Sequence, residues 1–240
     1  MLKDLLGIYK NCVVSIVGAG GKTSFMFNLA QELRSQNKVL LFTTTKIYVP
    51  SKEQYDFMAI GKKNFLHCCT LPEKGIYVYG NILDNNSKIS GLDEDTLIKE
   101  LHNFDYILIE ADGSKGKSLK GWRENEPVIF KGTNITVGII DITCLGKTIN
   151  SDNIHRVDRF IELTNSHLGE KVSLNHLISL ILHPNGLFKK SSGKKILFIN
   201  KVEDTNSTVF SKILSKNIKP HNYIDRIIMG SLKNKIYEVL

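Results

Sequence analysis

The sequence has few of the features that mark secreted proteins, membrane-spanning proteins or proteins stabilised by a structural metal ion. Its four cysteines, at positions 12, 68, 69 and 144, form no Cys-x-x-Cys pair, which argues against a zinc knuckle or a disulfide framework. No run approaches the ~20 apolar residues that cross a membrane, and the first residues are too broken for a signal peptide. We therefore expect a cytoplasmic protein without membrane attachment, in which Cys68 and Cys69 are small semi-buried residues rather than a soft-ligand site.

Repeats, low-complexity stretches and linkers are also missing, so we expect one domain over residues 1–240. The apolar fraction of 42% and the charged fraction of 23% are those of an ordinary globular chain. The net charge of +8 permits an anionic partner. However, the sequence contains neither an aromatic-basic stacking motif nor a helix-turn-helix signature, so nucleic acid is not the partner that we expect.

Short runs rich in β-branched residues alternate with amphipathic stretches along the chain. This alternation predicts an α/β fold in which a mostly parallel sheet is flanked by helices on both faces. The predicted strands cover residues 12–17, 38–42, 56–60, 76–79, 106–110, 135–141 and, as the last buried strand, 196–199. The predicted helices cover residues 22–35, 93–102, 173–182 and 205–214, with Ser173 as an N-cap.

The first predicted strand runs directly into a glycine-rich turn, and a helix follows. The turn and the start of the helix read Gly18-Ala19-Gly20-Gly21-Lys22-Thr23-Ser24. Glycines allow backbone N–H groups to surround a phosphate, and the helix N-terminus adds partial positive charge. The Lys22 ammonium would reach the β- and γ-phosphates, and the Thr23 hydroxyl would ligate Mg²⁺. The sequence therefore predicts a phosphate-binding loop (P-loop) for ATP or GTP with Mg²⁺.

This loop is a shortened variant of the common phosphate-binding pattern. That pattern requires a glycine five positions before Gly21, where this chain has Ile16. The form Gly-x-x-Gly-Lys-Thr resembles the loop of Mur-type peptide ligases. The spacing alone therefore leaves the class of nucleotide-binding enzyme open.

Two acidic residues mark the end of the buried strand at 106–110. Glu110 ends the apolar run and Asp112 lies two positions later, so extended geometry points both carboxylates to one side. P-loop proteins place a carboxylate here to hold Mg²⁺ or to orient the attacking water. We predict catalytic roles for Lys22, Glu110 and Asp112. Thr23 joins the two carboxylates as a predicted metal ligand, and the choice between the carboxylates stays open.

Polar residues at two other strand ends are expected to face the same crevice, because ligands bind outside the carboxyl ends of the strands in open α/β sheets. Thr43-Thr44-Thr45-Lys46 follows the second strand and could hold a phosphate, a metal-bound water or a substrate. Asn200-Lys201 follows the strand at 196–199 and resembles the start of the guanine motif Asn-Lys-x-Asp, with Glu203 and Asp204 near the last position. We include these six residues, 43–46 and 200–201, in the predicted nucleotide site and leave guanine specificity open.

Two basic segments complete the set of candidates. Residues 115–120 form a loop rich in Lys and Gly that could contact an anion, and the alternative is a solvated loop. Arg156 could act as a charge-stabilising finger from within the chain, and the alternative is the solvated start of a helix. The residue types alone do not separate these alternatives.

Together these segments resemble the YqeC-type proteins, which are described as selenium cofactor biosynthesis proteins and as accessory factors of selenium-dependent molybdenum hydroxylases. The resemblance rests on the segments at 17–23, 43–46, 110–120, 126–129, 155–156 and 200–202. The segment at 110–120, followed by Glu126-Pro127-Val128-Ile129, is the most specific, although Ser114 and Ser118 stand where Ala and Pro are common. The resemblance implies a P-loop NTPase-like fold and a role in maturing such a hydroxylase or its cofactor. It also favours functional roles for 43–46 and 115–120.

We therefore expect a nucleotide-binding and NTP-hydrolysing accessory factor. The first alternative is a P-loop small-molecule kinase or ligase, which would need an acceptor and would yield a phosphorylated or ligated product. The second alternative is a non-enzymatic module that binds nucleotide or nucleic acid. Binding to nucleic acid would then weaken steeply as the salt concentration rises.

Overall fold

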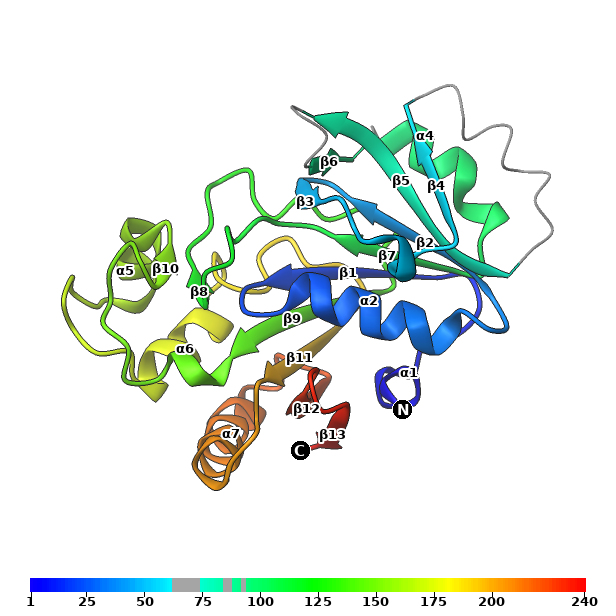
Figure 1. Cartoon of the computed structure of the whole chain (residues 1–240). Helices are drawn as coiled ribbons and strands as arrows, with labels where there is room; N and C mark the ends of the chain where they lie inside the picture. The colour runs from blue at the N-terminus through cyan, green and yellow to red at the C-terminus, as the bar shows by residue number, and fades with distance from the viewer. Residues whose placement is uncertain (62–73, 84–87, 92–93) are drawn as a thin grey trace.

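A large, mostly parallel β-sheet forms the centre of the fold (Figure 1). The computed structural model describes residues 1–61, 74–83, 88–91 and 94–240. The strands are β1 (Cys12–Gly18), β2 (Lys38–Thr43), β3 (Lys46–Tyr48), β4 (Phe57–Ile60), β5 (Gly75–Leu83), β6 (Lys88–Ser90), β7 (Tyr106–Glu110), β8 (Leu119–Lys120), β9 (Ile135–Asp141), β10 (Ile154–His155), β11 (Lys194–Asn200), β12 (Arg226–Ser231) and β13 (Ile236–Val239). Eleven of them form one sheet in the order β13-β12-β11-β9-β1-β7-β2-β5-β6-β3, with β4 paired to β5.

The pairing confirms the predicted fold class. The strands from β12 to β5 run parallel, β4 is parallel to β5, and antiparallel β13, β6 and β3 extend the two edges. β8 and β10 form a separate parallel pair. The helices are α1 (Leu2–Leu6), α2 (Lys22–Leu33), α4 (Glu94–Glu100), α5 (Val157–Thr164), α6 (Leu174–Leu182) and α7 (Thr205–Ile218), with short 3-10 turns η1 (Lys52–Gln54), η2 (Leu101–Asn103), η3 (Ile142–Cys144) and η4 (Lys219–His221).

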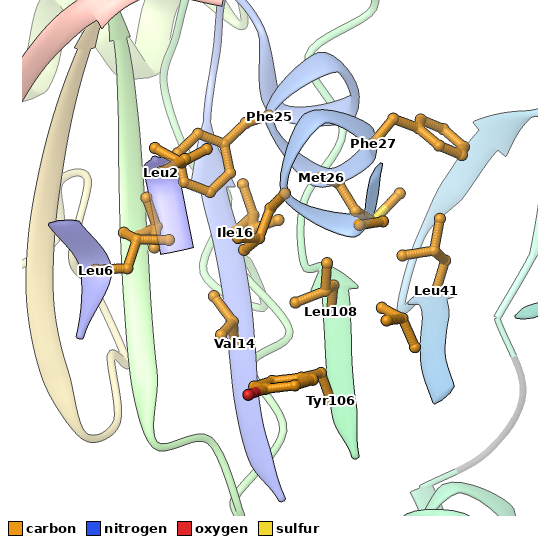
Figure 2. Close-up of a cluster of buried hydrophobic side chains, with 14 of the residues drawn as sticks. Leu2, Leu6, Val14, Ile16, Phe25, Met26, Phe27, Leu41, Tyr106 and Leu108 are labelled. Carbon is orange, nitrogen blue, oxygen red and sulfur yellow. The ribbon is translucent and has the colours of Figure 1, made fainter. Parts of the chain in front are cut away.

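Helices cover both faces of the sheet, as the alternation along β1 indicates. Val14 and Ile16 lie on the face covered by α1 and α2, where they belong to the same buried cluster as Phe25 and Met26 (Figure 2). Val17 belongs to a second cluster, which contains buried side chains of α6 and α7. Because both faces are buried, the central parallel strands are almost continuously apolar.

Helix α2 carries the apolar stripe that its sequence predicts. Phe25, Leu29 and Leu33 recur every four residues, and all three are buried. The ring of Phe25 meets the ring of Phe198 on β11 edge to face, with 5.1 Å between the ring centroids. Since α2 begins at Lys22, this packing holds the helix N-terminus against the carboxyl end of the sheet.

Most predicted elements appear with shifted ends. The seven predicted strands correspond to β1, β2, β4, β5, β7, β9 and β11, and the four predicted helices to α2, α4, α6 and α7. Ser173 caps α6 as predicted, because its hydroxyl oxygen accepts a hydrogen bond from the His176 N–H. The prediction that 196–199 is the last buried strand is wrong, because β12 follows it and every residue of β12 except Arg226 is buried.

Some predictions fall on parts of the chain that the structure does not describe. Cys68 and Cys69 lie outside the described residues, as does Asp93, the predicted first residue of the second helix. Cys12 and Cys144 are buried free thiols. Within the described ranges, no helix combines the length and the apolar character that crossing a membrane would need.

The packing of α2 predicts a strong dependence of stability on Phe25. Phe25→Ala should lower the free energy of unfolding by about 3–5 kcal/mol, because it opens a cavity between α2 and β11. Phe210 on α7 is 40% exposed, so the control Phe210→Ala should lose less than half as much. Urea unfolding followed by circular dichroism measures both variants, and equal losses would contradict this packing.

Candidate functional site

The glycine loop between β1 and α2 fits tightly against two neighbouring strands. Gly18, Gly20 and Gly21 have φ angles of +102°, +80° and +139°, which favour glycine. A Cβ atom added at Gly20 would lie 2.3 Å from the Cβ of Asp141, at the end of β9. One added at Gly21 would lie 2.3 Å from Nδ2 of Asn200, at the end of β11. The loop therefore requires glycine both for its backbone conformation and for its contacts.

The Lys22 side chain is folded back into the protein. Its exposed fraction is only 2%. The ammonium donates to the carbonyl oxygen of Gly18 at 2.7 Å and to Oγ of Ser114 at 3.2 Å. It also lies 3.3 Å from Oδ1 of Asp112 and 3.8 Å from Oε1 of Glu110. Both predicted carboxylates thus point toward Lys22, and they compensate a charge that would otherwise be buried alone.

Asp112 is a fully buried carboxylate that connects several elements. Its Oδ2 accepts hydrogen bonds from the Gly18 N–H at 3.1 Å and from the Trp122 indole at 2.7 Å. Nζ of Lys120 lies 3.2 Å from the same oxygen. Burial alone would raise the pKa of Asp112, but Lys22, Lys120 and these hydrogen bonds lower its pKa overall. Asp112 is therefore an ionised counter-charge for two buried lysines.

Glu110 differs from Asp112 in its environment. Its Oε2 accepts a hydrogen bond of 2.6 Å from the Thr23 hydroxyl. Burial raises the pKa of Glu110, and the opposing influence of Lys22 and of the Thr23 hydroxyl does not cancel this effect. Glu110 is thus the carboxylate of the pair that takes up a proton more readily.

A cleft of about 1370 Å³ opens at the carboxyl ends of the strands, next to this cluster. The predicted site residues in its wall are Gly20, Gly21, Lys22, Thr23, Ser24, Thr45, Lys46, Glu110, Asn200 and Lys201. Further lining comes from the basic loop, from its neighbours and from the β12–β13 turn, namely Ser114, Lys115, Gly116, Lys117, Glu126, His155, Arg156, Glu203, Leu232 and Lys233. Most of the predicted site thus meets at one cavity. Gly18, Ala19, Thr43 and Asp112 are buried and do not line it, and the half-buried Thr44 does not line it either.

The segment 43–46 divides into two parts. The Thr43 hydroxyl donates to the carbonyl oxygen of Glu110 at 3.0 Å, and the Thr44 hydroxyl donates to that of Val128 at 2.9 Å. These two threonines therefore join β2 to its neighbours. Thr45 and Lys46 face the cleft instead.

The segment after β11 supports the loop and also reaches the cleft. Nδ2 of Asn200 donates to the Gly20 carbonyl oxygen at 2.8 Å, and Nζ of Lys201 lies 2.5 Å from Oδ2 of Asp141. Asp204 caps α7 by accepting from a backbone N–H. Glu203, which accepts a hydrogen bond from Ser231, is thus the carboxylate of this segment that lines the cleft.

The charge cluster continues to residues whose partners the sequence does not reveal. Nζ of Lys120 lies 3.5 Å from Oε2 of Glu126, and the Arg156 guanidinium forms a two-pronged ion pair with the same carboxylate. His155 lies beside them, and burial together with the charges of Arg156 and Lys120 lowers its pKa to about 4. His155 is therefore neutral at physiological pH.

Asp141 is a further buried acid, and it is not among the predicted site residues. It follows a run of apolar residues at the carboxyl end of a parallel strand, as Glu110 does. This shared position was the available signal, because such ends face the ligand crevice. Its carboxylate holds Lys201 and caps the turn η3 through the Thr143 N–H.

Comparison with known proteins assigns a family to this arrangement. The family described as YqeC protein matches residues 14–158, more than half of the chain. The chain belongs to the YqeC family. It is also 29% identical over 235 residues to a protein of Escherichia coli (strain K12) named Uncharacterized protein YqeC, covering 96% of this chain and 91% of that protein. The family match includes the phosphate loop, 43–46 and both carboxylates, and it ends before Asn200 and Lys201.

The two carboxylates should respond differently to replacement. The lowered pKa of Asp112 implies a stabilising contribution that is present above about pH 4 and lost as the pH falls through the folded-state pKa. The raised pKa of Glu110 implies the opposite, namely a contribution lost as the pH rises. At pH 7, Asp112→Asn should therefore lower the free energy of unfolding by about 3–5 kcal/mol, and Glu110→Gln by clearly less.

Urea unfolding at pH 7 and at pH 3.5 measures this difference. The loss caused by Asp112→Asn should shrink at the lower pH, because the unfolded wild-type chain then binds a proton at Asp112 that the folded protein, with its lowered pKa, binds less readily. Equal losses for both variants at pH 7 would show that Asp112 is not the counter-charge of the two lysines.

Proposed function

We propose that this protein binds ATP or GTP with Mg²⁺ and hydrolyses it, as an accessory factor in the maturation of a selenium-dependent molybdenum hydroxylase or its cofactor. The observation that carries the nucleotide part is the position of Lys22. Lys22 is the first residue of α2 and lines the cleft, and the partners of its ammonium are the loop carbonyl of Gly18 and nearby acids. A nucleotide phosphate would offer this ammonium a stronger, charge-assisted partner than a neutral carbonyl oxygen.

The backbone around Lys22 supports the same proposal. Gly20, Gly21, Lys22 and Thr23 line the cleft at the N-terminal end of a twelve-residue helix. The first N–H groups of a helix have no partner within the helix, and the helix dipole favours negative charge there. An anion at this point would therefore be held by backbone N–H groups as well as by the ammonium.

Thr23 and Glu110 are the residues that fit Mg²⁺. Their side-chain oxygens are 2.6 Å apart in the cleft wall, and Mg²⁺ prefers hard oxygen ligands. No group of three or more His, Cys, Asp or Glu suited to a metal occurs in the part of the chain that the structure describes. In this proposal, Thr23 and Glu110 would hold Mg²⁺ together with the nucleotide, and the ion would neutralise phosphate charge.

The environments of the acids suggest a division of roles between Glu110 and Asp112. Glu110 borders the cleft and has a raised pKa, as suits a residue that orients water or accepts its proton. Asp112 lies behind the wall and acts through Lys22, whose position it fixes. Asp112 thus serves catalysis as a positioning residue rather than as a direct ligand.

The maturation role rests on the YqeC family and on the motifs that this chain shares with it. Turnover of the nucleotide would order the loops around a partner enzyme or its cofactor and then release them. The basic loop at 115–120 suits such a change, since Lys115 and Lys117 border the cleft close to the phosphate loop.

A P-loop kinase or ligase is the second candidate function. The cleft extends beyond Glu110 to Lys46 and Tyr48, which leaves room for an acceptor beside the phosphates. An acceptor-dependent product would favour this candidate, and hydrolysis without any acceptor would favour the NTPase.

Nucleotide binding should depend on Lys22. With Mg²⁺, ATP or GTP should raise the melting temperature, because a ligand that binds only the folded state stabilises it. Lys22→Ala should abolish this increase. Lys212→Ala removes an exposed lysine of α7 and should leave the increase in melting temperature unchanged.

A thermal-shift panel of ATP, GTP and their diphosphates, with and without Mg²⁺, measures these effects. Each variant is compared with its own melting temperature in the absence of nucleotide, so a change in stability is not mistaken for a change in binding. Equal increases for Lys22→Ala and wild type would overturn the proposed function.

A further inference from the structure

The antiparallel pair β3–β6 forms a short ribbon beside the phosphate site. Ile47 pairs with Ile89, and both side chains are buried in the main core. Lys46, Tyr48 and Lys88 lie in the cleft wall instead. In a strand, residues two apart share a face, so Lys46 and Tyr48 project from the same side of the ribbon.

The ribbon is fixed in position relative to Glu110. A Cβ atom added at Gly91 would lie 1.5 Å from the carbonyl oxygen of Thr43, so the chain after β6 passes directly over the end of β2. The Thr43 hydroxyl is in turn bonded to the backbone of Glu110. In the order of the sheet, the ribbon thus lies beyond β2 on one side of β1, whereas Asn200 and Lys201 lie on the other side, where β9 and β11 are.

The outward face of the ribbon carries an exposed aromatic ring between positive charges. Tyr48 is 73% exposed, the largest value among the exposed apolar and aromatic side chains of the described residues. Nζ of Lys88 lies over the ring, 5.1 Å from its centroid. Among the described residues, no carboxylate forms an ion pair with Lys46 or Lys88. The face therefore offers one aromatic ring and two ammonium groups that have no carboxylate partner among the described residues.

The charge of the whole cleft also favours an anionic ligand. Among the described residues, eight Lys or Arg side chains line it, against three Glu carboxylates. Lys22, Lys201 and Arg156 each have a carboxylate partner, whereas Lys46 and Lys88 have none among the described residues. The unpaired charge on the ribbon lies away from these groups, where a second ligand would meet it.

We propose that the outward face of β3–β6 is a second ligand subsite, for a planar aromatic compound that carries a phosphate or a similar anionic group. The ring stacks on Tyr48, and the anionic group lies between Lys46 and Lys88. Aromatic stacking combined with nearby cations is a general way of holding such compounds. Its position beside a bound nucleotide rests on the proposed function, whereas the binding of the aromatic compound itself does not.

Flavin mononucleotide is a suitable probe, because it has a planar ring and one phosphate and its fluorescence changes on stacking. Wild type should bind it, and Tyr48→Ala should weaken binding about tenfold or more. Lys88→Glu should weaken it by a similar factor. Riboflavin, which lacks the phosphate, should bind wild type more weakly than flavin mononucleotide.

Matched controls come from exposed residues outside the cleft. Tyr9 is 57% exposed, so Tyr9→Ala removes a comparable ring. Lys212→Glu reverses the charge of an exposed lysine on α7. Neither control should change the affinity for flavin mononucleotide more than about twofold. Lys22→Ala should also leave it within this range, because the probe does not use the phosphate loop.

A parallel titration with a fluorescent Mg²⁺–nucleotide separates this proposal from the proposed function. Loss of flavin mononucleotide binding in Tyr48→Ala with unchanged nucleotide affinity supports the subsite. If wild type binds flavin mononucleotide but no nucleotide, and Tyr48→Ala loses flavin mononucleotide binding, the subsite is supported and the proposed function is overturned. Failure of wild type to bind the probe, or equal weakening of both ligands by Tyr48→Ala, would overturn the subsite.

Discussion

The ion pairs of Asp112 with Lys22 and Lys120 are the interactions on which the site depends. Two lysines are almost completely buried here, and burying an unpaired ammonium would be strongly unfavourable. Asp112 compensates both and also accepts hydrogen bonds from Gly18 and Trp122. The end of β1, the phosphate loop and the segment after β7 are thereby held together by one carboxylate. This arrangement explains why a polar cluster persists next to an apolar core.

The same carboxylate connects the phosphate loop with the outer part of the cleft. From Asp112 the contacts pass through Lys120 to Glu126 and then to Arg156. Arg156 lies at the start of α5 and borders the cleft that Lys22 also borders. A phosphate bound to Lys22 would add negative charge at one end of this series. The contacts are continuous from the proposed nucleotide site to the start of α5.

The fold was largely predictable because apolar runs and amphipathic periods are local signals. Buried strands such as β7 and β9 stand out as continuous apolar runs, and their predicted bounds match the structure. β12 was missed because its run is short and ends in Gly230 and Ser231, and glycine is depleted in strands. The ribbon β3–β6 was missed because strands of three residues carry too little pattern to recognise.

The candidate site was predictable in its members and less so in their roles. Glu110 was predicted from its position at the end of a buried strand, Lys22 from the glycine loop before it, and Asn200 from a strand end that resembles the guanine motif. Such strand ends converge at one edge of the sheet. The sequence could not show that Asp112 lies behind the wall or that Thr43 and Thr44 bond to neighbouring backbone. Those facts depend on tertiary contacts, such as the one between Asp112 and Trp122.

The claim that Lys22 binds a nucleotide phosphate is tested most directly at Trp122, because both residues contact Asp112. This residue is the one tryptophan of the chain, and its indole N–H donates to Asp112. Its indole N–H resonance should shift in a saturable manner as Mg²⁺–ATP or Mg²⁺–GTP is added, because a phosphate bound to Lys22 changes the charge next to Asp112. A nucleotide that binds without moving this resonance, or an equal shift in Lys22→Ala, would contradict the claim.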